Sequence, residues 1–195
     1  MKLDRKDIID IFNFRFATKE FTGEIIPKED MEMIAETARL SPSSFGLEPW
    51  KFLIVENKEL IKEISEVSWG FQRQASTTSH IVIALTKEGI KDVLKNFQVG
   101  KLEADETNEK LLEWSKRQTY IALGNMMTAA AMREIDSCAI EGFDKEKVEE
   151  ILVKKGLLDK EKYELTYLIA FGYRKEEPNR KKSRLPKSEV IQWVE

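Results

Sequence analysis

One predicted helix that is apolar on nearly every side constrains the fold of this chain more than any other segment. Residues 118–134 are rich in alanine and methionine, and their apolar stretch is interrupted by Asn125 and Thr128. That stretch is too short to cross a bilayer. A helix of this kind must be covered by the rest of the fold or by another chain. The sequence therefore predicts a helix that is buried in the domain or against a second chain.

Helical and strand-like segments alternate through the rest of the chain. Apolar residues three and four positions apart predict helices at residues 4–12, 27–41, around 60–64 and 145–154. Short apolar runs predict buried strands at residues 51–55, 80–85, 137–140 and 164–173. Residues 88–116 are charged and mixed, which favours one or two exposed helices. The pattern indicates a single domain over residues 1–195, of the α/β or α+β class, with one sheet between helices.

Composition limits the chemistry that the chain can carry out alone. It has 195 residues, a net charge of −3, one histidine and one cysteine. One cysteine cannot form an internal disulfide, and one histidine cannot build a histidine-rich metal site. We therefore expect no metal, and chemistry that comes from a cofactor or from carboxylates.

The first ten residues do not resemble a secretory signal. They read MKLDRKDIID, with five charges in the first seven residues and no apolar core. We therefore expect a cytoplasmic protein with no membrane partner.

His80 and Cys138 are poor candidates for catalysis. His80 opens an apolar run, and no nucleophile-elbow sequence lies near it, which favours a histidine that is hydrogen-bonded at the end of a strand. Cys138 lies among small and apolar residues, which favours a buried hydrophobic role.

A basic segment stands out in a chain whose net charge is negative. Residues 174–187 include seven basic and two acidic side chains, a local charge of +5. The segment is either a solvated tail or the holder of an anion. A non-enzymatic anion or nucleic-acid binder is the weaker alternative, because the isoelectric point is about 5.6 and no strand is rich in aromatic residues. We expect no nucleic-acid partner.

Four segments carry chemistry that suits a cofactor. Residues 15–19 and 182–186 offer cations, residues 41–50 form a hydroxyl-rich loop, and residues 139–144 place a glycine turn directly after a predicted strand. Arginine binds phosphate through paired hydrogen bonds, and a main-chain N–H at a glycine can meet a ring atom where a side chain would not fit. Each segment alone is more often a solvated helix end or an ordinary turn. Together they favour a flat, phosphorylated cofactor.

The order of these segments resembles the nitroreductase family of FMN-dependent oxidoreductases. The similarity covers residues 11–193 and implies an α+β fold with a central, mostly antiparallel sheet flanked by helices, in an interleaved homodimer. The family's R-x-S-x-K opening corresponds here to RFATK at residues 15–19, and its P-S-S-x-N-x-Q-P-W loop to PSSFGLEPW at 42–50. Its A-S-H strand entry corresponds to TSH at 78–80, and its I-E-G-F-D and K-x-R-L-P motifs occur at 140–144 and 182–186.

The resemblance implies how cations would hold the cofactor. Arg15, Lys182 and Arg184 are expected at the FMN phosphate and the nearby ribityl oxygens. Lys19 is expected at the N1 and C2-carbonyl edge of the flavin, where a positive charge favours reduction.

Serines, amides and a main-chain N–H would make the remaining contacts. Ser43 and Ser44 are expected to reach the flavin from the partner subunit. Glu141 and Gly142 are expected to lie against the ring, with a main-chain N–H directed at the reactive N5 atom. The implied set of cofactor-binding residues is Arg15, Phe16, Ala17, Lys19, Pro42, Ser43, Ser44, Gly46, Gln72, Gln74, Ile140, Glu141, Gly142, Lys182 and Arg184.

The implied activity is hydride transfer from NADH or NADPH to resident FMN, and onward to a nitro-aromatic, a quinone or a similar flat acceptor, by a ping-pong mechanism. No side chain is expected to act as a nucleophile or general base. The nine glycines never occur in G-x-G spacing, so the chain lacks a dinucleotide-binding fingerprint, as expected if the nicotinamide nucleotide is only a visiting co-substrate.

Four positions depart from the family pattern. Ala17 replaces a common serine, Gly46 an asparagine, Glu48 a glutamine and Phe71 an asparagine. The departures leave open a flavin-binding protein of the same fold with a specialised or weak reductase activity. Acceptor choice is expected to depend on residues 86–116 and on Phe71, which either walls the pocket or is an ordinary packing aromatic.

Overall fold

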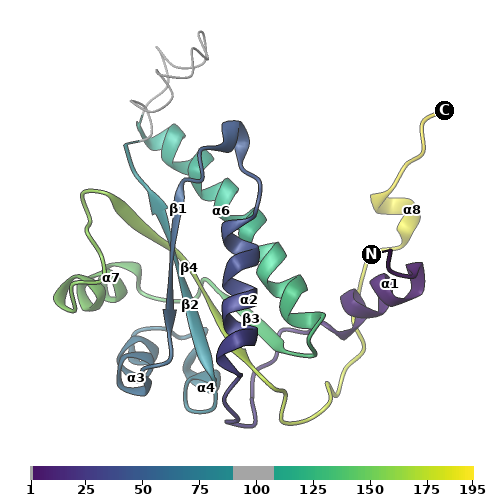
Figure 1. Cartoon of the computed structure of the whole chain (residues 1–195), viewed down its shortest axis with the longest axis horizontal. Helices are drawn as coiled ribbons and strands as arrows, with labels where there is room; N and C mark the ends of the chain where they lie inside the picture. The colour runs from purple at the N-terminus through teal and green to yellow at the C-terminus, as the bar shows by residue number, and fades with distance from the viewer. Residues whose placement is uncertain (1, 90–107) are drawn as a thin grey trace.

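The computed structural model describes residues 2–89 and 108–195, and a four-stranded sheet lies at its centre (Figure 1). All neighbouring strands are antiparallel, which confirms the expected α+β class with a mostly antiparallel sheet. In the spatial order β1-β2-β4-β3, the strands are β1 (Trp50–Val55), β2 (His80–Lys87), β4 (Tyr163–Gly172) and β3 (Asp136–Ile140).

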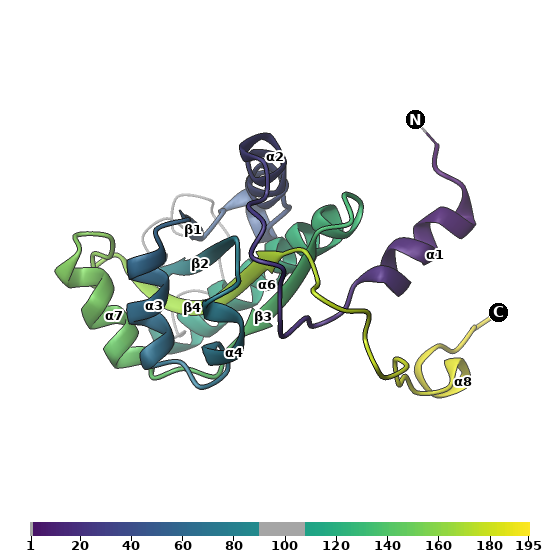
Figure 2. The same ribbon diagram turned by 90° about the horizontal axis from the view of Figure 1, so that it is seen from below.

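Helices cover both faces of the sheet (Figures 1 and 2). One face carries α2 (Lys28–Arg39) and α6 (Asn108–Ala131). The other carries α3 (Lys58–Glu66), α4 (Gln72–Ala75) and α7 (Lys145–Lys154). A single 3₁₀ turn, Ser44–Gly46, lies in the loop between α2 and β1.

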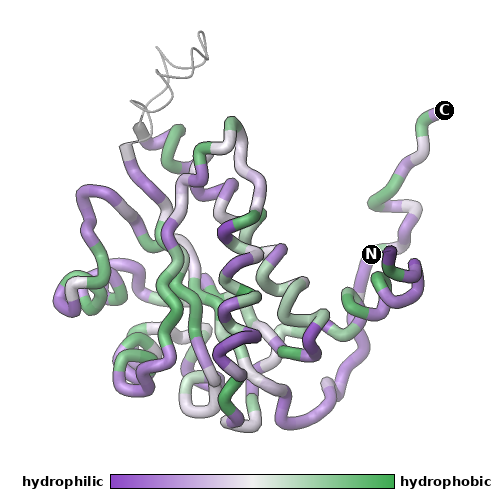
Figure 3. The backbone as a smooth tube through the Cα atoms, in the orientation of Figure 1, coloured by the Kyte–Doolittle hydropathy of each residue, from purple (hydrophilic) through white to green (hydrophobic). Residues whose placement is uncertain are grey.

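Two apolar cores, one on each face, hold the helices to the sheet. Successive residues of β2 alternate between them, because side chains of a strand point to opposite faces. Ile81 and Ile83 belong to the core under α3 and α7, whereas Val82 and Ala84 belong to the core under α2 and α6. Burial on both faces explains why β2 and β4 are nearly continuous apolar runs, which lie in the hydrophobic centre of Figure 3.

The long helix α6 is where the structure differs most from the sequence-based expectation. It begins at Asn108, ten residues before the expected residue 118, and ends at Ala131. Charged residues conceal its first turns in the sequence, although Leu111, Leu112 and Trp114 are partly buried there. It ends early because Glu134 takes a left-handed conformation with φ 56°. Residues 108–116 are therefore part of α6 and not a separate exposed helix, and residues 90–107 lie outside the described part of the chain.

Two segments project from the sheet domain on the same side (Figures 1 and 2). The helix α1 (Arg5–Phe14) buries no residue. The chain after β4 passes close to the end of α1 and then continues outward through α8 (Lys187–Val190), which was not predicted. Among residues 2–89 and 108–195, no helix combines the length and hydrophobicity that a membrane span requires.

Candidate functional site

A cationic cavity lies where the segment after α1 meets the segment after β4. The two segments run side by side, because the Thr22 N–H donates to the Tyr173 carbonyl at 2.9 Å and the Lys175 N–H donates to the Glu20 carbonyl at 3.1 Å. Five residues predicted from the sequence share this cavity with two of their neighbours. The cavity measures about 240 Å³ and is lined by Arg15, Phe16, Ala17, Arg180, Lys182, Ser183 and Arg184.

The cations of this cavity are not neutralised within the described part of the chain. Arg15, Lys182 and Arg184 form no ion pair with a described acidic side chain, and Lys182 Nζ instead donates to the Phe12 carbonyl at 2.5 Å. Partial burial, and then the positive charges of Arg15, Arg184 and Arg174, lower the pKa of Lys182. A bound anion would offset this repulsion. The donor set therefore fits a phosphate group.

Lys19 and Gln74 meet at the sulfur of Cys138. Lys19 lines a neighbouring cavity of about 370 Å³, and its Nζ donates to Cys138 Sγ at 3.2 Å. Gln74 Nε2 lies 3.5 Å from the same sulfur. Cys138 is 1% exposed, which confirms that it is buried, and its contact with an ammonium group was not expected. Gln72, two residues before Gln74 on α4, is exposed.

The glycine turn after β3 packs tightly against the chain before α4. The Gly70 N–H donates to the Gly142 carbonyl at 2.7 Å, and a Cβ on Gly70 would lie 3.2 Å from Gly142 Cα. Ile140 is the buried last residue of β3, and Glu141 is exposed and accepts a hydrogen bond from the Tyr120 hydroxyl at 2.6 Å. Burial and this hydrogen bond raise the pKa of Tyr120, so the phenol remains the donor. The turn thus places backbone where a side chain would not fit.

The serine loop lies far from the cationic cavity within one chain. Residues 42–46 follow the end of α2, whereas residues 15–19 lead toward its beginning, and α2 is about 18 Å long (Figure 1). The Ser44 N–H donates to Gln118 of α6 at 2.9 Å, and Ser43 Oγ accepts from the Glu48 N–H at 2.8 Å. The structure therefore does not bring Pro42, Ser43, Ser44 and Gly46 to the other predicted cofactor residues of the same chain.

Phe71 does not wall a pocket, and the alternative of ordinary packing is correct. Its side chain is fully buried in the core shared with α3 and α7. The exposed aromatic of this stretch is Trp69, which is 69% exposed, and its Nε1 would lie 2.7 Å from a Cβ on Gly142. The sequence motif did not single out Trp69; its aromatic side chain beside a glycine was the available signal.

His80 has the structural role that the sequence favoured. It is 5% exposed at the start of β2, and its Nδ1 lies 2.8 Å from the Ser79 hydroxyl oxygen. Its Nε2 lies 3.6 Å from a carboxylate oxygen of Glu56. Burial lowers the pKa of His80 in spite of that carboxylate, so the ring stays neutral near pH 7.

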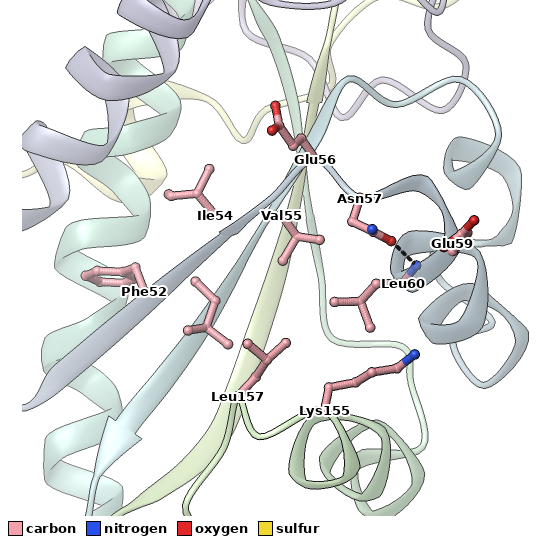
Figure 4. Close-up of a pocket in the computed structure, with 10 residues that line it drawn as sticks. Phe52, Ile54, Val55, Glu56, Asn57, Glu59, Leu60, Lys155 and Leu157 are labelled. Atoms are coloured by element: carbon pink, nitrogen blue, oxygen red, sulfur yellow. Dashed lines mark hydrogen bonds between the residues drawn. The ribbon is translucent and has the colours of Figure 1, made fainter.

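A larger groove of about 650 Å³ lies on another part of the domain, beside β1 (Figure 4). Apolar side chains of β1 form one wall, and Leu60 of α3 and Leu157 after α7 line it from the other side. None of the predicted cofactor residues lines this groove. We therefore place the candidate site at the cationic cavity and the glycine turn.

Comparison of the sequence with known proteins identifies its family. Residues 13–173 match the family model described as "Nitroreductase family". A Staphylococcus haemolyticus protein that is provisionally named an NAD(P)H nitroreductase is 43% identical over 97% of this chain and 98% of its own length. YfkO of Bacillus subtilis, which has the same provisional name, is 40% identical over 97% of this chain and 98% of its own length.

Solved structures share the fold. A nitroreductase family protein from Streptococcus pneumoniae superposes with a TM-score of 0.78 at 25% identity, over 95% of this chain and 99% of its own. A provisionally named nitroreductase from Exiguobacterium sibiricum, solved in complex with FMN, has a TM-score of 0.78 at 21% identity, over 100% of this chain and 99% of its own. Because the family model spans most of the sequence and relatives match it from end to end, the chain belongs to the nitroreductase family.

Proposed function

We propose that this protein is an FMN-dependent oxidoreductase that takes hydride from NADH or NADPH and reduces a nitro-aromatic, a quinone or a similar flat acceptor. The observation that carries the proposal is the group of Arg15, Lys182 and Arg184 around one cavity, with no described carboxylate to neutralise it. A phosphate group has the charge and the hydrogen-bond acceptors that this group of cations lacks. The FMN complex of a structural neighbour supports the choice of phosphorylated ligand.

In this proposal the side chains bind and orient, and none is a nucleophile. When bound, FMN supplies the hydride-accepting and hydride-donating chemistry. The Lys19 ammonium, held at Cys138 Sγ, would place a positive charge beside a bound flavin ring and would favour its reduction. Gly142 contributes a main-chain N–H from a turn that the contact with Gly70 makes rigid. The work of the protein is positioning and electrostatics.

We propose further that the nicotinamide nucleotide and the acceptor use the site in turn, by a ping-pong mechanism. The sequence has no G-x-G spacing and therefore no resident dinucleotide site of the common kind. A co-substrate without a site of its own must leave before the acceptor enters. Trp69, exposed beside Gly142, is suitably placed to contact whichever flat molecule is bound.

A homodimer is the proposed assembly, because one chain leaves much apolar surface uncovered. Ile9 and Phe12 of α1 are more than half exposed, as is Trp193 near the C-terminal end. Ile121 of α6 and Met132, the residue directly after α6, are also exposed. The sequence predicts that the fold or a second chain covers this helix. A second copy provides a self-complementary cover for such surfaces.

The C-terminal segment of a second copy is the proposed occupant of the groove beside β1. As a sheet edge among the described strands, β1 presents unpaired backbone groups, and Ile54 on it is 42% exposed. The segment after α8 begins with extended backbone at Ile191 and carries the exposed Trp193 and Val194. An apolar, extended segment can pair with such an edge by strand addition.

A dimer would also complete the cofactor site. Within one chain, Ser44 donates a hydrogen bond to Gln118, whereas Glu141 accepts one from Tyr120. Gln118 and Tyr120 are two residues apart on α6, and side chains at that spacing are rotated by about 200° around the helix axis. The serine loop and the glycine turn therefore lie on different sides of α6. We propose that Ser43 and Ser44 serve the flavin of the partner subunit.

Removing residues 188–195 is expected to convert the dimer to a monomer and to abolish FMN binding, because the deleted segment covers apolar surface of the partner. Light scattering after size-exclusion chromatography measures the mass, and fluorescence titration measures FMN binding. Removing Glu195 alone is the matched control and should change neither property. A truncated protein that stays dimeric and retains FMN would refute this assembly.

The proposed function is tested by the colour of the purified protein. We expect a yellow preparation with flavin absorbance that NADH or NADPH bleaches under nitrogen, and recovery of the colour when a quinone or nitro-aromatic is added. A colourless protein that fails to bind added FMN would contradict the proposal. A yellow protein that no nicotinamide nucleotide bleaches would favour a flavin-binding protein with little reductase activity.

A further inference from the structure

Arg174 belongs to the basic segment of the sequence but does not face the cationic cavity. Its Nε lies 3.0 Å from Asp136 Oδ2 and its Nη2 lies 3.0 Å from Oδ1 of the same carboxylate. The Arg174 main-chain N–H also donates to Oδ2 at 3.0 Å. Asp136, the first residue of β3, is 1% exposed. The charge of Arg174 is therefore neutralised inside the protein and is not available to a ligand.

The same ion pair holds the segment that carries Arg15. Thr18 Oγ1 donates to Asp136 Oδ1 at 2.7 Å. Arg174 Nη2 donates to the carbonyl of Phe14, the residue directly before Arg15, at 2.9 Å, and the guanidinium lies 4.2 Å from the centre of the Phe14 ring. We call Arg174, Asp136 and Thr18 the Asp136 clamp. It fixes the backbone on both sides of Arg15 and next to Lys19.

Other contacts of this segment are the hydrogen bond from Lys19 to Cys138 and the Arg180 guanidinium, 5.3 Å from the centre of the Phe16 ring. α1, which precedes it, contacts α6 but buries no residue. Ala17 forms one isolated bridge with Ser137, the residue after Asp136. Buried ion pairs contribute little net stability compared with apolar packing. In several proteins their role is to select one conformation of the chain. The position of the clamp behind a binding segment fits that role.

We propose that the Asp136 clamp is a positioning unit that sets Arg15 in the cationic cavity, and that it thereby determines the preference for FMN over riboflavin, which lacks the phosphate. The inference rests on the proposed function, because it assumes that the cavity holds the FMN phosphate. Arg174, Asp136 and Thr18 touch no ligand in this scheme. They act through Arg15.

Thr18→Val tests the clamp with little risk to folding, because it removes one hydroxyl and leaves the Arg174–Asp136 pair intact. We expect the dissociation constant of FMN to rise about fivefold while that of riboflavin changes less than about twofold. Thr18→Ser restores the hydroxyl and should restore the wild-type ratio of the two constants. Fluorescence titration of the apoprotein measures both, and thermal unfolding of the apoprotein records stability separately.

Asp136→Asn and Asp30→Asn form a matched pair of stronger variants. Asp30 pairs with Arg133 at 2.9 Å on the surface, away from the cavity, so its replacement should leave both affinities unchanged. Asp136→Asn should lower FMN affinity more than Thr18→Val does. If Thr18→Val lowers FMN and riboflavin affinities equally, or lowers neither, the clamp proposal is wrong although the proposed function stands. If the wild-type protein itself fails to bind FMN, the proposed function falls, and this inference with it.

Discussion

Replacing Arg15 and Arg184 together with alanine is expected to weaken FMN binding by at least about 100-fold. Each guanidinium can make charge-assisted hydrogen bonds to a phosphate, and such a bond contributes about 1.5–3 kcal/mol. Losing both contacts therefore costs about 3 kcal/mol or more of binding free energy, and each 1.4 kcal/mol raises the dissociation constant about tenfold. Titration of the apoprotein with FMN, followed by quenching of flavin fluorescence, measures the loss.

The matched control for this variant is Lys181→Ala with Lys187→Ala. It removes the same net charge, here from the basic segment alone, and neither lysine lines the cationic cavity. We expect its FMN affinity to stay within about twofold of the wild type, because charges exposed to solvent are screened. Equal losses in both double variants would mean that the segment attracts FMN through its overall charge. Unchanged affinity in the arginine variant would place the phosphate elsewhere.

Local patterns in the sequence predicted most of the fold. The expected helix at residues 145–154 matches α7, because Asp144 caps its first turn and the apolar spacing is regular. The strands were predicted within two residues, because each is a short and mostly apolar run, and β2 and β4 are largely buried. The start of α6 was missed because its partly buried side chains lie among charged ones.

The candidate site could be predicted only in pieces. Motifs identified Arg15, Lys182 and Arg184, and the structure places them around one cavity. The contacts that position them join residues far apart in the sequence: Arg174 and Asp136 are separated by 38 positions, and Lys19 and Cys138 by 119. Such pairings depend on how strands and loops meet in space, and no local pattern encodes them. The burial of Phe71 also depends on contacts between distant segments. Local sequence does not distinguish it from Trp69, two residues away, which is exposed.

The free energy of unfolding is expected to fall by about 1–3 kcal/mol in Gly172→Ala, because the added methyl group has no space. Gly172 is the last residue of β4, and a Cβ there would lie 2.7 Å from both Cγ and Cδ1 of Phe21. The Phe21 ring is 1% exposed within the core and cannot move aside freely. Urea unfolding at one fixed protein concentration measures the difference.

Gly124→Ala is the control for this substitution. Gly124 lies within α6, and a Cβ there would meet nothing within 4 Å, so alanine should be neutral or stabilising in a helix. In the Gly172→Ala background, Phe21→Leu should recover part of the lost stability, since a smaller side chain leaves room for the methyl group; the two changes should therefore be non-additive.

Phe21 follows Lys19 by two residues, so the Gly172→Ala variant, in which Phe21 is displaced, should also bind FMN more weakly. If Gly172→Ala is as stable as Gly124→Ala, the close packing of β4 against this segment does not constrain the site.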